Sequence, residues 1–330
     1  MIKKIIYYLF ANLINLNLYL IKKKYKSKLI HPYNFSFGDT FVFYITHYNL
    51  INSQKKKVII FGNLDKKIAE FFFYKDQIYK LFFFVPKLIS AYPLNYFLKK
   101  KKYFKIKQNL NIDYANKIAK KKHKHLLVNI LRTNYKQVNS NIKFLKKKKF
   151  VLILIKHNNK NSNDISGSQT RQTADFTKIF LMIKYILKKN LKVVILGNQK
   201  DKSVNIIENH LKDKNLFFFK NLSPKQTIID QLFLHKYSQF GIGNDSGGWI
   251  ISFFLQKKLF LFDSFMSSNN SLYKKYKNVF LMPKKITYES KTVDLTYKIS
   301  DKILKNKIPY KVIEVPLKQI TKTLRKNYKI

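Results

Sequence analysis

The feature that most constrains the fold is an alternation, from His31 onward, of short apolar runs with Lys-rich segments of helical period. The clearest example is the apolar run Phe150–Ile155, which has the length and composition of a buried strand. A segment of helical period at Phe176–Lys189 follows it, and then a second strand pattern at Lys192–Leu196. Strands that alternate with helices favour a sheet covered by helices. We therefore predict the α/β class.

The same alternation continues through the second half of the chain. Further strands are predicted at Leu216–Phe219, Phe240–Gly243 and Leu259–Phe262, and further helices at Val204–Leu211, Thr227–His235 and Trp249–Leu255. Repeated strand–helix units of this kind predict a doubly wound parallel sheet. In the first half the pattern is less regular, and it predicts a helix opening at Phe41–Ile45 and strands at Val58–Phe61, Leu81–Val85 and Leu126–Ile130.

A length of 330 residues suggests about two domains. The Lys run 146–149 precedes the strongest strand, so we place the main boundary there. The predicted organisation is an apolar and basic helix at 1–30, a first α/β domain at 31–145, a second at 146–312 and a carboxyl-terminal helix at 313–330.

The apolar segment Ile5–Ile21 is bounded by lysines on both sides and could contact a membrane. Asn12, Asn15 and two tyrosines fall on a single helical stripe, which is typical of a helix that lies in the membrane interface. Such polar residues make it marginal as a spanning helix, and no small-residue cleavage site follows it. The alternative is a helix packed on the body of the protein.

The chain carries 66 Lys and Arg against 17 Asp and Glu, a formal net charge of +49. Such a charge favours an anionic partner, either nucleic acid or a membrane surface. The chain has only three Arg residues: Arg132, Arg171 and Arg325. Nucleic-acid-binding surfaces usually rely on Arg, because its guanidinium group forms bidentate hydrogen bonds with guanine and phosphate. We favour the alternative that the composition fills neutral surface positions with Lys, so we expect no specific nucleic-acid partner. The absence of Cys excludes disulfides, Cys-ligated metals and a thiol nucleophile.

The strongest local motif is Gly241-Ile-Gly-Asn-Asp-Ser-Gly-Gly248, between a predicted strand and a predicted helix. Glycines in such a turn let backbone amides approach an anion, and a helix dipole favours phosphate at the same place. The spacing is neither the dinucleotide fingerprint nor a Walker loop. The alternative is a tight connection in which Asn244, Asp245 or Ser246 caps the helix.

Four further residues, at three places in the sequence, are candidates for chemistry. Asp39, in a Gly-Asp turn before an apolar segment, is either a general base or a helix cap. Lys156 and His157 directly follow the Phe150–Ile155 strand, where open α/β sheets bind ligands. Arg171 lies in a polar loop, where it is either a bidentate phosphate contact or an incidental surface residue.

Other classes of site lack their motifs. The chain has no His-Glu-x-x-His motif, no EF-hand loop and no Gly-x-Ser-x-Gly elbow. His123 and His125 lie among lysines, which would repel a metal ion, so we interpret them as part of a solvated basic turn. We expect no metal site and no bound cofactor.

The second half, over about residues 150–328, resembles a family of glycosyltransferases found with bacterial surface-polysaccharide genes, which is distantly similar to the lipopolysaccharide heptosyltransferases. The matching segments, in order, are Val151–His157, Arg171–Asp175, Lys192–Gly197, Gln239–Gly247, Met282–Ile286, Asp294–Ile299 and Tyr310–Pro316. In the first half, Gly38-Asp39-Thr40 is similar to the Gly-Asp turn of the heptosyltransferases, although the surface-polysaccharide family often has His at that place.

The resemblance implies the GT-B fold, in which two Rossmann-like domains face a cleft that takes the acceptor on the first and a nucleotide-sugar on the second. It implies that Asp39 is the base, that inversion accompanies transfer and that no metal is needed. Donor contacts would come from Lys156, His157, Arg171, Gly197, Asn244, Asp245, Ser246, Gly247 and Gly248. Acceptors in such systems are often lipid-linked glycans, so we expect a peripheral or monotopic protein on the cytoplasmic face of an inner membrane.

Two alternatives remain open. A basic RNA- or membrane-binding protein without catalysis could use the same scaffold, and it would explain the charge directly. A degenerate transferase that binds a sugar nucleotide without turnover is the other, because fold alone does not determine function.

Overall fold

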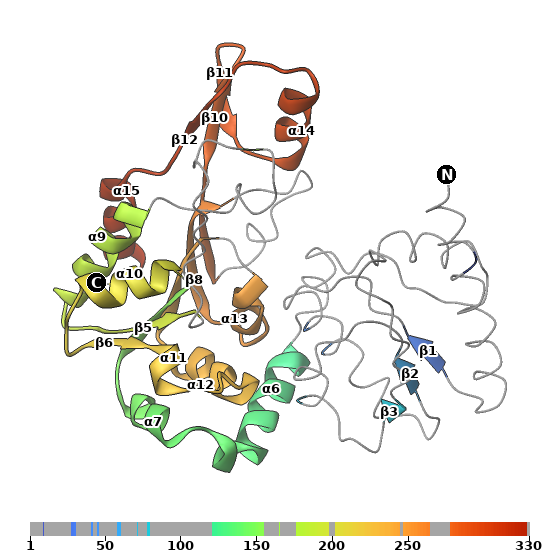
Figure 1. Ribbon diagram of the computed structural model, residues 1–330, viewed down its shortest axis with the longest axis vertical. Helices are drawn as coiled ribbons and strands as arrows, with labels where there is room; N and C mark the ends of the chain where they lie inside the picture. The colour runs from blue at the N-terminus through green and yellow to red at the C-terminus, as the bar shows by residue number, and fades with distance from the viewer. Residues whose placement is uncertain are drawn as a thin grey trace. The chain divides into compact units, whose positions relative to one another are not determined.

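In the computed structural model the second half of the chain is described over residues 121–154, 176–197, 202–244, 247–264 and 278–328. Described besides these are the short strands 28–30, 58–60 and 78–79 and the single residues Leu9, Phe41, Ile45, Phe71 and Ile165. The chain divides into two compact units, residues 1–118 and 119–330 (Figure 1).

The first unit contains three parallel strands in the order β1-β2-β3: Lys28–Ile30, Val58–Ile60 and Ile78–Tyr79. The strand predicted at Val58–Phe61 is confirmed as β2. Phe41 and Ile45 are helical and buried, as the predicted helix requires. The segments Ile5–Ile21, apart from Leu9, and Leu81–Val85 lie outside the described residues. Within the described parts of the chain, no helix is long and apolar enough to cross a membrane.

The second unit is built on a six-stranded parallel sheet in the order β6-β5-β4-β7-β8-β9. Renumbered within the unit this is 3-2-1-4-5-6, the order of a doubly wound Rossmann fold. The predicted α/β class and doubly wound sheet are confirmed. The strands are β4 Phe150–Leu154, β5 Lys192–Leu196, β6 Leu216–Phe218, β7 Phe240–Gly243, β8 Lys258–Ser264 and β9 Val279–Pro283.

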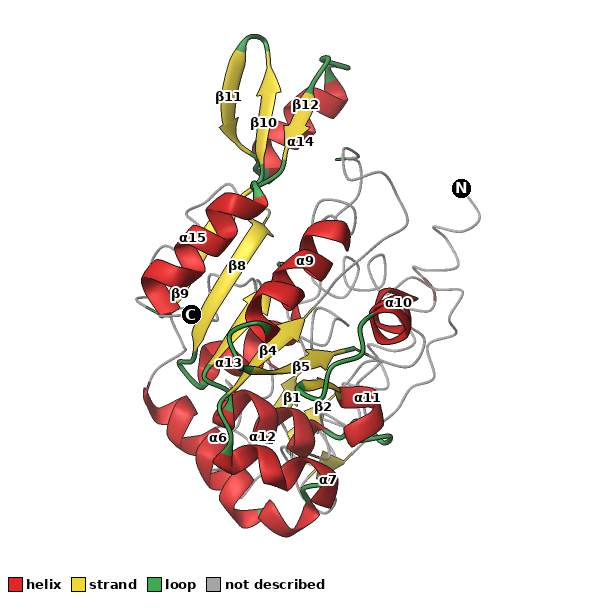
Figure 2. Ribbon diagram, turned by 90° about the vertical axis from the view of Figure 1, so that its left-hand side faces the viewer, coloured by secondary structure: helices red, strands yellow, loops and turns green. Residues whose placement is uncertain are grey.

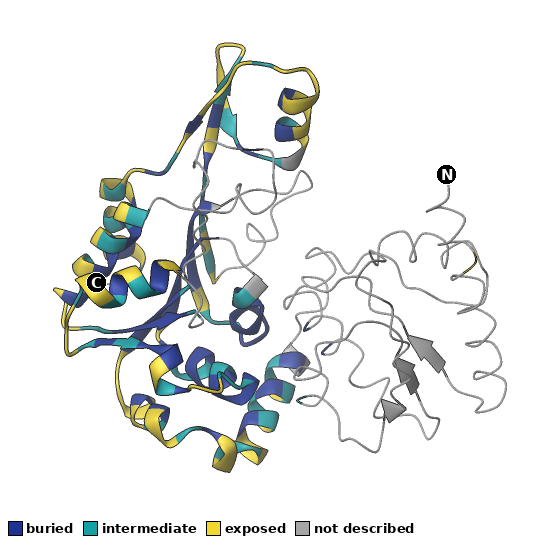
Figure 3. Cartoon of the chain, viewed as in Figure 1, coloured by how far each residue is buried: buried dark blue, intermediate teal, exposed yellow. Residues whose placement is uncertain are grey.

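Helices cover both faces of this sheet because the side chains of a strand alternate between its faces. Val151 and Ile153 of β4 join the core beneath α9 Phe176–Leu187, α10 Lys202–His210 and α15 Leu317–Tyr328 (Figure 1). The opposite face carries α6 Lys121–Thr133, α11 Phe219–Leu222, α12 Ile228–Tyr237 and α13 Ile250–Phe254. The central strands are buried along their length (Figure 3).

A small antiparallel sheet extends from the second unit, in the order β11-β10-β12 (Figure 2). Its strands are β10 Lys285–Tyr288, β11 Lys291–Asp294 and β12 Lys311–Ile313, and α14 Tyr297–Lys305 packs on it. Thr296 caps α14 by accepting a hydrogen bond from the Ile299 amide (3.2 Å). Ile286, Leu295 and Ile303 form a core of its own.

The strand predicted at Leu126–Ile130 is wrong, because these residues lie inside α6. His123, Leu127 and Leu131 are buried at intervals of four residues, which is a helical period. The solvated turn predicted for His123 and His125 is wrong for the same reason: the His123 ring is buried edge-on against Phe254 (5.7 Å), and only His125 is exposed.

The helix α6 also bears on the division of the chain. It packs against α12 and α13, so it belongs with the second unit, and the structural division at 118/119 precedes the 145/146 boundary drawn from the sequence. Between α6 and β4, the turn η2 Tyr135–Gln137, α7 Ser140–Lys143 and the turn η3 Phe144–Lys147 lead into the sheet.

Candidate functional site at the carboxyl edge of the sheet

The strand order of the second sheet reverses at one point, between β4 and β7. The chain leaves β4 toward β5 on one side and later returns to β7 on the other, with Leu154 of β4 paired with Gly243 of β7. Ligands of open α/β sheets bind beyond the carboxyl ends of the two strands at such a switch point. The predicted positions Lys156 and His157 follow β4 in the chain, and Asn244–Gly248 follow β7.

Two glycines of β7 are required by close packing. A Cβ added to Gly243 would overlap the carbonyl oxygen of Leu154, and one added to Gly241 would overlap the side chains of Trp249 and Leu259. The strand therefore approaches both the backbone of β4 and the Trp249 ring more closely than any other residue type allows. The close packing of β7 therefore constrains the position from which the following turn begins.

Trp249 holds the start of this turn from beneath. Its ring is fully buried, and its indole N–H donates to the carbonyl oxygen of the buried Asn244 (3.1 Å). The His235 ring meets Trp249 edge-on (5.9 Å between centroids), and its Nδ1 lies 2.6 Å from the Ser252 hydroxyl. Burial, with a smaller contribution from the charge of Lys257, lowers the pKa of His235 to about 3, so the ring is neutral near pH 7.

The helix that follows the turn is shorter than predicted. Instead of a helix over Trp249–Leu255, a 3₁₀ turn at Gly247–Trp249 leads into the five-residue α13. A helix this short aligns few peptide dipoles. An anion held here would therefore depend on backbone amides and nearby cations more than on a helix dipole.

The structure describes four of the ten predicted site residues. Asn244, Gly247 and Gly248 lie in and after the turn beyond β7, and Gly197 directly follows β5, which pairs with β4 on the side opposite β7. The Gly197 carbonyl accepts a hydrogen bond from the Gln226 side chain (3.2 Å). The remaining predicted residues, Asp39, Lys156, His157, Arg171, Asp245 and Ser246, lie outside the described residues, so their roles stay predictions.

The sequence reasoning missed a group of charged side chains at the same edge. Lys178, in the first turn of α9, lies 2.6 Å from Asp263 at the end of β8 and 2.7 Å from Glu314. Lys284, directly after β9, lies 3.6 Å from Glu314. We call these four residues the edge cluster. The chain has only 17 Asp and Glu residues, so a carboxylate directly after a buried strand is unusual in this sequence. Asp263, directly after the apolar run of β8, was therefore the sequence signal that pointed to the edge cluster.

The edge cluster ties four parts of the second unit together. Asp263 also accepts a hydrogen bond from the backbone amide of Val315 (2.7 Å), which joins the sheet to the segment between β12 and α15. Burial raises the pKa of Asp263 despite the nearby charge of Lys178, and burial lowers the pKa of Lys284 despite Glu314. The cluster therefore fixes the start of α9 beside the ends of β8 and β9.

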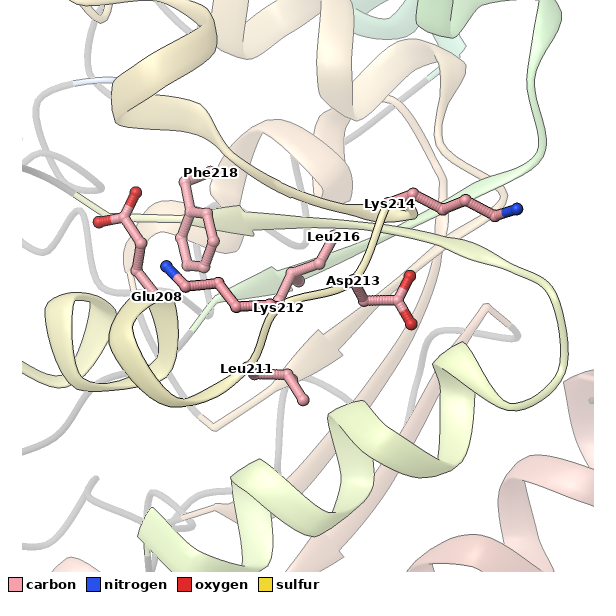
Figure 4. Close-up of a pocket in the computed structure, with 7 residues that line it drawn as sticks. All are labelled: Glu208, Leu211, Lys212, Asp213, Lys214, Leu216 and Phe218. Atoms are coloured by element: carbon pink, nitrogen blue, oxygen red, sulfur yellow. The ribbon is translucent and has the colours of Figure 1, made fainter.

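A separate hollow of about 540 Å³ lies beside α10 and β6 (Figure 4). Its residues Leu211–Lys214 precede β6, so most of it belongs to the amino side of the sheet. The carboxylate of Glu208, which lines it, is paired with Lys220 (2.5 Å). In the described part of the chain, no group of three or more His, Asp or Glu side chains is arranged to hold a metal ion.

No protein-family model and no curated protein matches this chain. Among solved structures it is similar to the Escherichia coli heptosyltransferase WaaC with ADP-2-deoxy-2-fluoro heptose, at 7% identity and TM-score 0.39, covering 85% of this chain and 99% of that one. It is also similar to E. coli ADP-heptose lps heptosyltransferase II, at 9% identity and TM-score 0.42, covering 91% and 98%.

A third similar structure is a glycosyl transferase of family 9 from Veillonella parvula, at 10% identity and TM-score 0.35, covering 89% of this chain and 80% of that one. The heptosyltransferases are the enzymes to which the sequence itself shows a distant resemblance. Because each TM-score lies below 0.5, we base the proposal below on the topology and contacts of this chain.

Proposed function

We propose that the chain is a glycosyltransferase that moves a sugar from a nucleotide-sugar to a glycan of the cell envelope. One observation carries the proposal: the predicted phosphate-binding residues directly follow β4 and β7, the two strands at the switch point of the second sheet. This is the place where doubly wound sheets bind nucleotides.

The donor diphosphate would lie on the turn 244–248, where Gly247 and Gly248 let backbone amides approach it. Because α13 is short, Lys156 and Arg171 would supply most of the charge that stabilises the leaving diphosphate. His157 and the backbone at Gly197 would contact the nucleoside. Ser246 would donate to the diphosphate, and Asp245 would hold the loop or a sugar hydroxyl.

In the proposed reaction Asp39 accepts the proton of the acceptor hydroxyl. The acceptor oxygen then attacks the anomeric carbon, the bond from that carbon to the diphosphate oxygen breaks, and the nucleoside diphosphate leaves. Attack from the face opposite the leaving group inverts the anomeric centre. Cations of the chain neutralise the diphosphate in this scheme, so transfer would need no metal ion.

The acceptor is proposed to be a lipid-linked glycan, and the protein to work at the cytoplasmic face of an inner membrane. The net charge of +49 supports this location, because each Lys close to an anionic bilayer contributes about 1 kcal/mol of binding. The apolar segment Ile5–Ile21 would add a hydrophobic contact.

The test is the release of nucleoside diphosphate from a panel of nucleotide-sugars by the full chain with lipid-linked acceptor. Asp39→Asn should abolish release while the protein still binds the nucleotide, because the amide cannot accept the proton. Asp213→Asn, an exposed position before β6, is the matched control and should leave release unchanged. Turnover by Asp39→Asn at the wild-type rate would refute its role as the base.

A further inference from the structure

The amino edge of the second sheet, opposite the candidate site, is lined by lysines. Because the strands of this sheet run parallel, all of them begin at this one edge. A lysine stands at the start of five neighbouring strands or within four residues before it: Lys214 before β6, Lys192 in β5, Lys149 before β4, Lys236 in the last turn of α12 before β7, and Lys258 in β8. Asp213 also precedes β6, so the edge is strongly but not uniformly basic.

The segment that leads into β4 adds to this charge. Residues 124–149 contain eight Lys or Arg and no Asp or Glu. Lys146–Lys149 and Arg132 are exposed, and none of the cations of 124–149 forms an ion pair with a carboxylate of the described residues. The positive charge of this edge is therefore available to an external anion.

Part of the edge is shaped into a hollow of about 420 Å³. Its walls come from α6, the η2 and η3 turns and the end of α12, and they include Arg132, Lys146 and Lys236. The Lys146 ammonium lies over the rings of Tyr135 (5.1 Å to the centroid) and Tyr237 (5.5 Å). The rings hold this cation in place without neutralising it.

A further lysine, Lys257, lies close to the cations of this edge. Lys257, in the turn between α13 and β8, donates to the carbonyl oxygen of Lys236 (3.3 Å). Partial burial, followed by the charges of Lys236 and Lys124, lowers the pKa of Lys257 to about 8. An anion on this surface would relieve the repulsion among these groups.

The residue types favour a lipid bilayer as the source of that anion. Phe144 is 41% exposed beside the Lys146–Lys149 run and packs its ring on Phe217 (5.5 Å between centroids). Lysines beside an exposed aromatic ring and partly exposed tyrosines suit the headgroup layer of a bilayer. Binding there needs positive charge and does not need hydrogen bonds to specific bases. Arg132 is the one Arg on this surface, whereas nucleic-acid surfaces draw on Arg for base and phosphate contacts.

We propose that this amino-edge surface, comprising Lys146–Lys149, Arg132, Lys236, Tyr135, Tyr237 and Phe144, docks on an anionic phospholipid bilayer. Arg132, Lys146 and Lys236 receive a headgroup phosphate in the hollow between the two tyrosines, and Phe144 enters the headgroup layer. The inference deepens the proposed function by naming the membrane-facing surface, and it rests on that function only for the choice of membrane.

The test is co-sedimentation of the full chain with vesicles of phosphatidylcholine containing about 30% phosphatidylglycerol, against vesicles of phosphatidylcholine alone. The variant changes Lys146, Lys147, Lys148 and Lys149 to Gln. The matched control changes four lysines elsewhere on the second unit, Lys305, Lys318, Lys322 and Lys326, to Gln, so that net charge falls equally. All eight side chains are exposed, and melting curves check that both variants fold.

We expect the wild type and the control variant to bind the anionic vesicles. The Lys146–Lys149 variant should bind them at least about tenfold more weakly, because each cation near the bilayer contributes separately. Equal binding by both variants would overturn the proposal, since residues 1–30 or the total charge would then account for docking. Failure of the wild type to bind would also overturn it.

A single-stranded RNA is tested in parallel. The wild type could bind RNA but not vesicles, and the Lys146–Lys149 variant could lose the RNA binding. This result would overturn the bilayer as the partner and assign the surface to nucleic acid. Vesicle binding needs no donor, so its result is separate from that of the nucleotide-release assay. Docking without nucleotide release would contradict the proposed function alone, and release without docking would contradict this inference alone.

Discussion

The indole N–H of Trp249 donates to the backbone carbonyl oxygen of Asn244, with 3.1 Å between the two heavy atoms. The bond closes the turn that follows β7 over a fully buried ring. The geometry of the candidate phosphate turn therefore depends on one side chain beneath it, and the first prediction follows from this dependence.

Trp249→Phe should both destabilise the protein and weaken nucleotide binding. It leaves the buried carbonyl of Asn244 without this donor, at a cost of about 1–3 kcal/mol, and frees the turn to move. The control is Tyr328→Phe, which also removes a donor to a backbone carbonyl, that of Leu259 (2.9 Å), but at the amino end of β8. Denaturation should show losses in both variants, whereas calorimetry should show weaker nucleotide binding only in Trp249→Phe. Equal nucleotide affinity in the two would contradict the role of Trp249.

The two glycines of β7 should differ in their tolerance of alanine. At Gly243 the added Cβ meets the backbone carbonyl of Leu154, which cannot move without disturbing the β4–β7 pairing. At Gly241 it meets the side chains of Trp249 and Leu259, which are buried but less constrained than the paired backbone of β4. Overpacking lowers the free energy of unfolding by about 1–3 kcal/mol, so we expect Gly243→Ala to lose about 3 kcal/mol or more and Gly241→Ala to lose less than that. Urea denaturation measures both, and the reverse order would contradict the packing described here.

His235 should make the protein less stable in acid. Its pKa in the folded protein is lowered from 6.5 to about 3, so the unfolded chain binds the proton first as the pH falls below 6.5. Stability should then decrease by about 1.4 kcal/mol per pH unit through that range. His235→Gln removes the titrating group. The slope of its unfolding free energy against pH should therefore be smaller than that of the wild type by the same ~1.4 kcal/mol per pH unit. Urea denaturation at several pH values tests this, and parallel slopes for the two proteins would contradict a buried neutral His235.

The edge cluster should behave as a coupled unit. Lys178→Met removes the cation that lies 2.6 Å from the buried Asp263 and should cost about 3–5 kcal/mol, because it leaves a buried charge uncompensated. Asp263→Asn removes that charge and retains an oxygen for the Val315 amide. The double variant should therefore be destabilised by less than the sum of the two single losses. A double-mutant cycle by urea denaturation measures the coupling, and simple additivity would refute it.

Five of the six strands in the large sheet of the second unit were predictable because they are short apolar runs bounded by turn residues, whereas β9 was not predicted. Phe150–Ile155 and Lys192–Leu196 match β4 and β5 to within a residue. The run Leu126–Ile130 was wrongly predicted as a strand. Its five residues, four apolar and one Asn, are too few to distinguish a strand from a helix. The distinguishing signal was the four-residue spacing of His123, Leu127 and Leu131.

The candidate site was predictable only in part. Glycine turns after apolar strands identify the turn beyond β7, because strand ends and glycines are local features of the sequence. The edge cluster was not found, since Lys178, Asp263 and Glu314 are far apart in the chain and come together only through the sheet topology. The shortness of α13 could not be foreseen either, because the apolar residues Trp249–Leu255 suit a full helix.

The most direct test of the central claim uses Trp249, the single Trp of the chain. Its fluorescence is titrated with a panel of nucleoside diphosphates and nucleotide-sugars, ADP and UDP among them, at moderate salt. We predict a saturable change that is selective for one nucleotide, weakened in Lys156→Gln and kept in Lys305→Gln. Melting at 100 times the dissociation constant should then show about 2.7 kcal/mol of added stability. No change in fluorescence or melting with any nucleotide would contradict the assignment of a nucleotide-sugar site to the turn beyond β7.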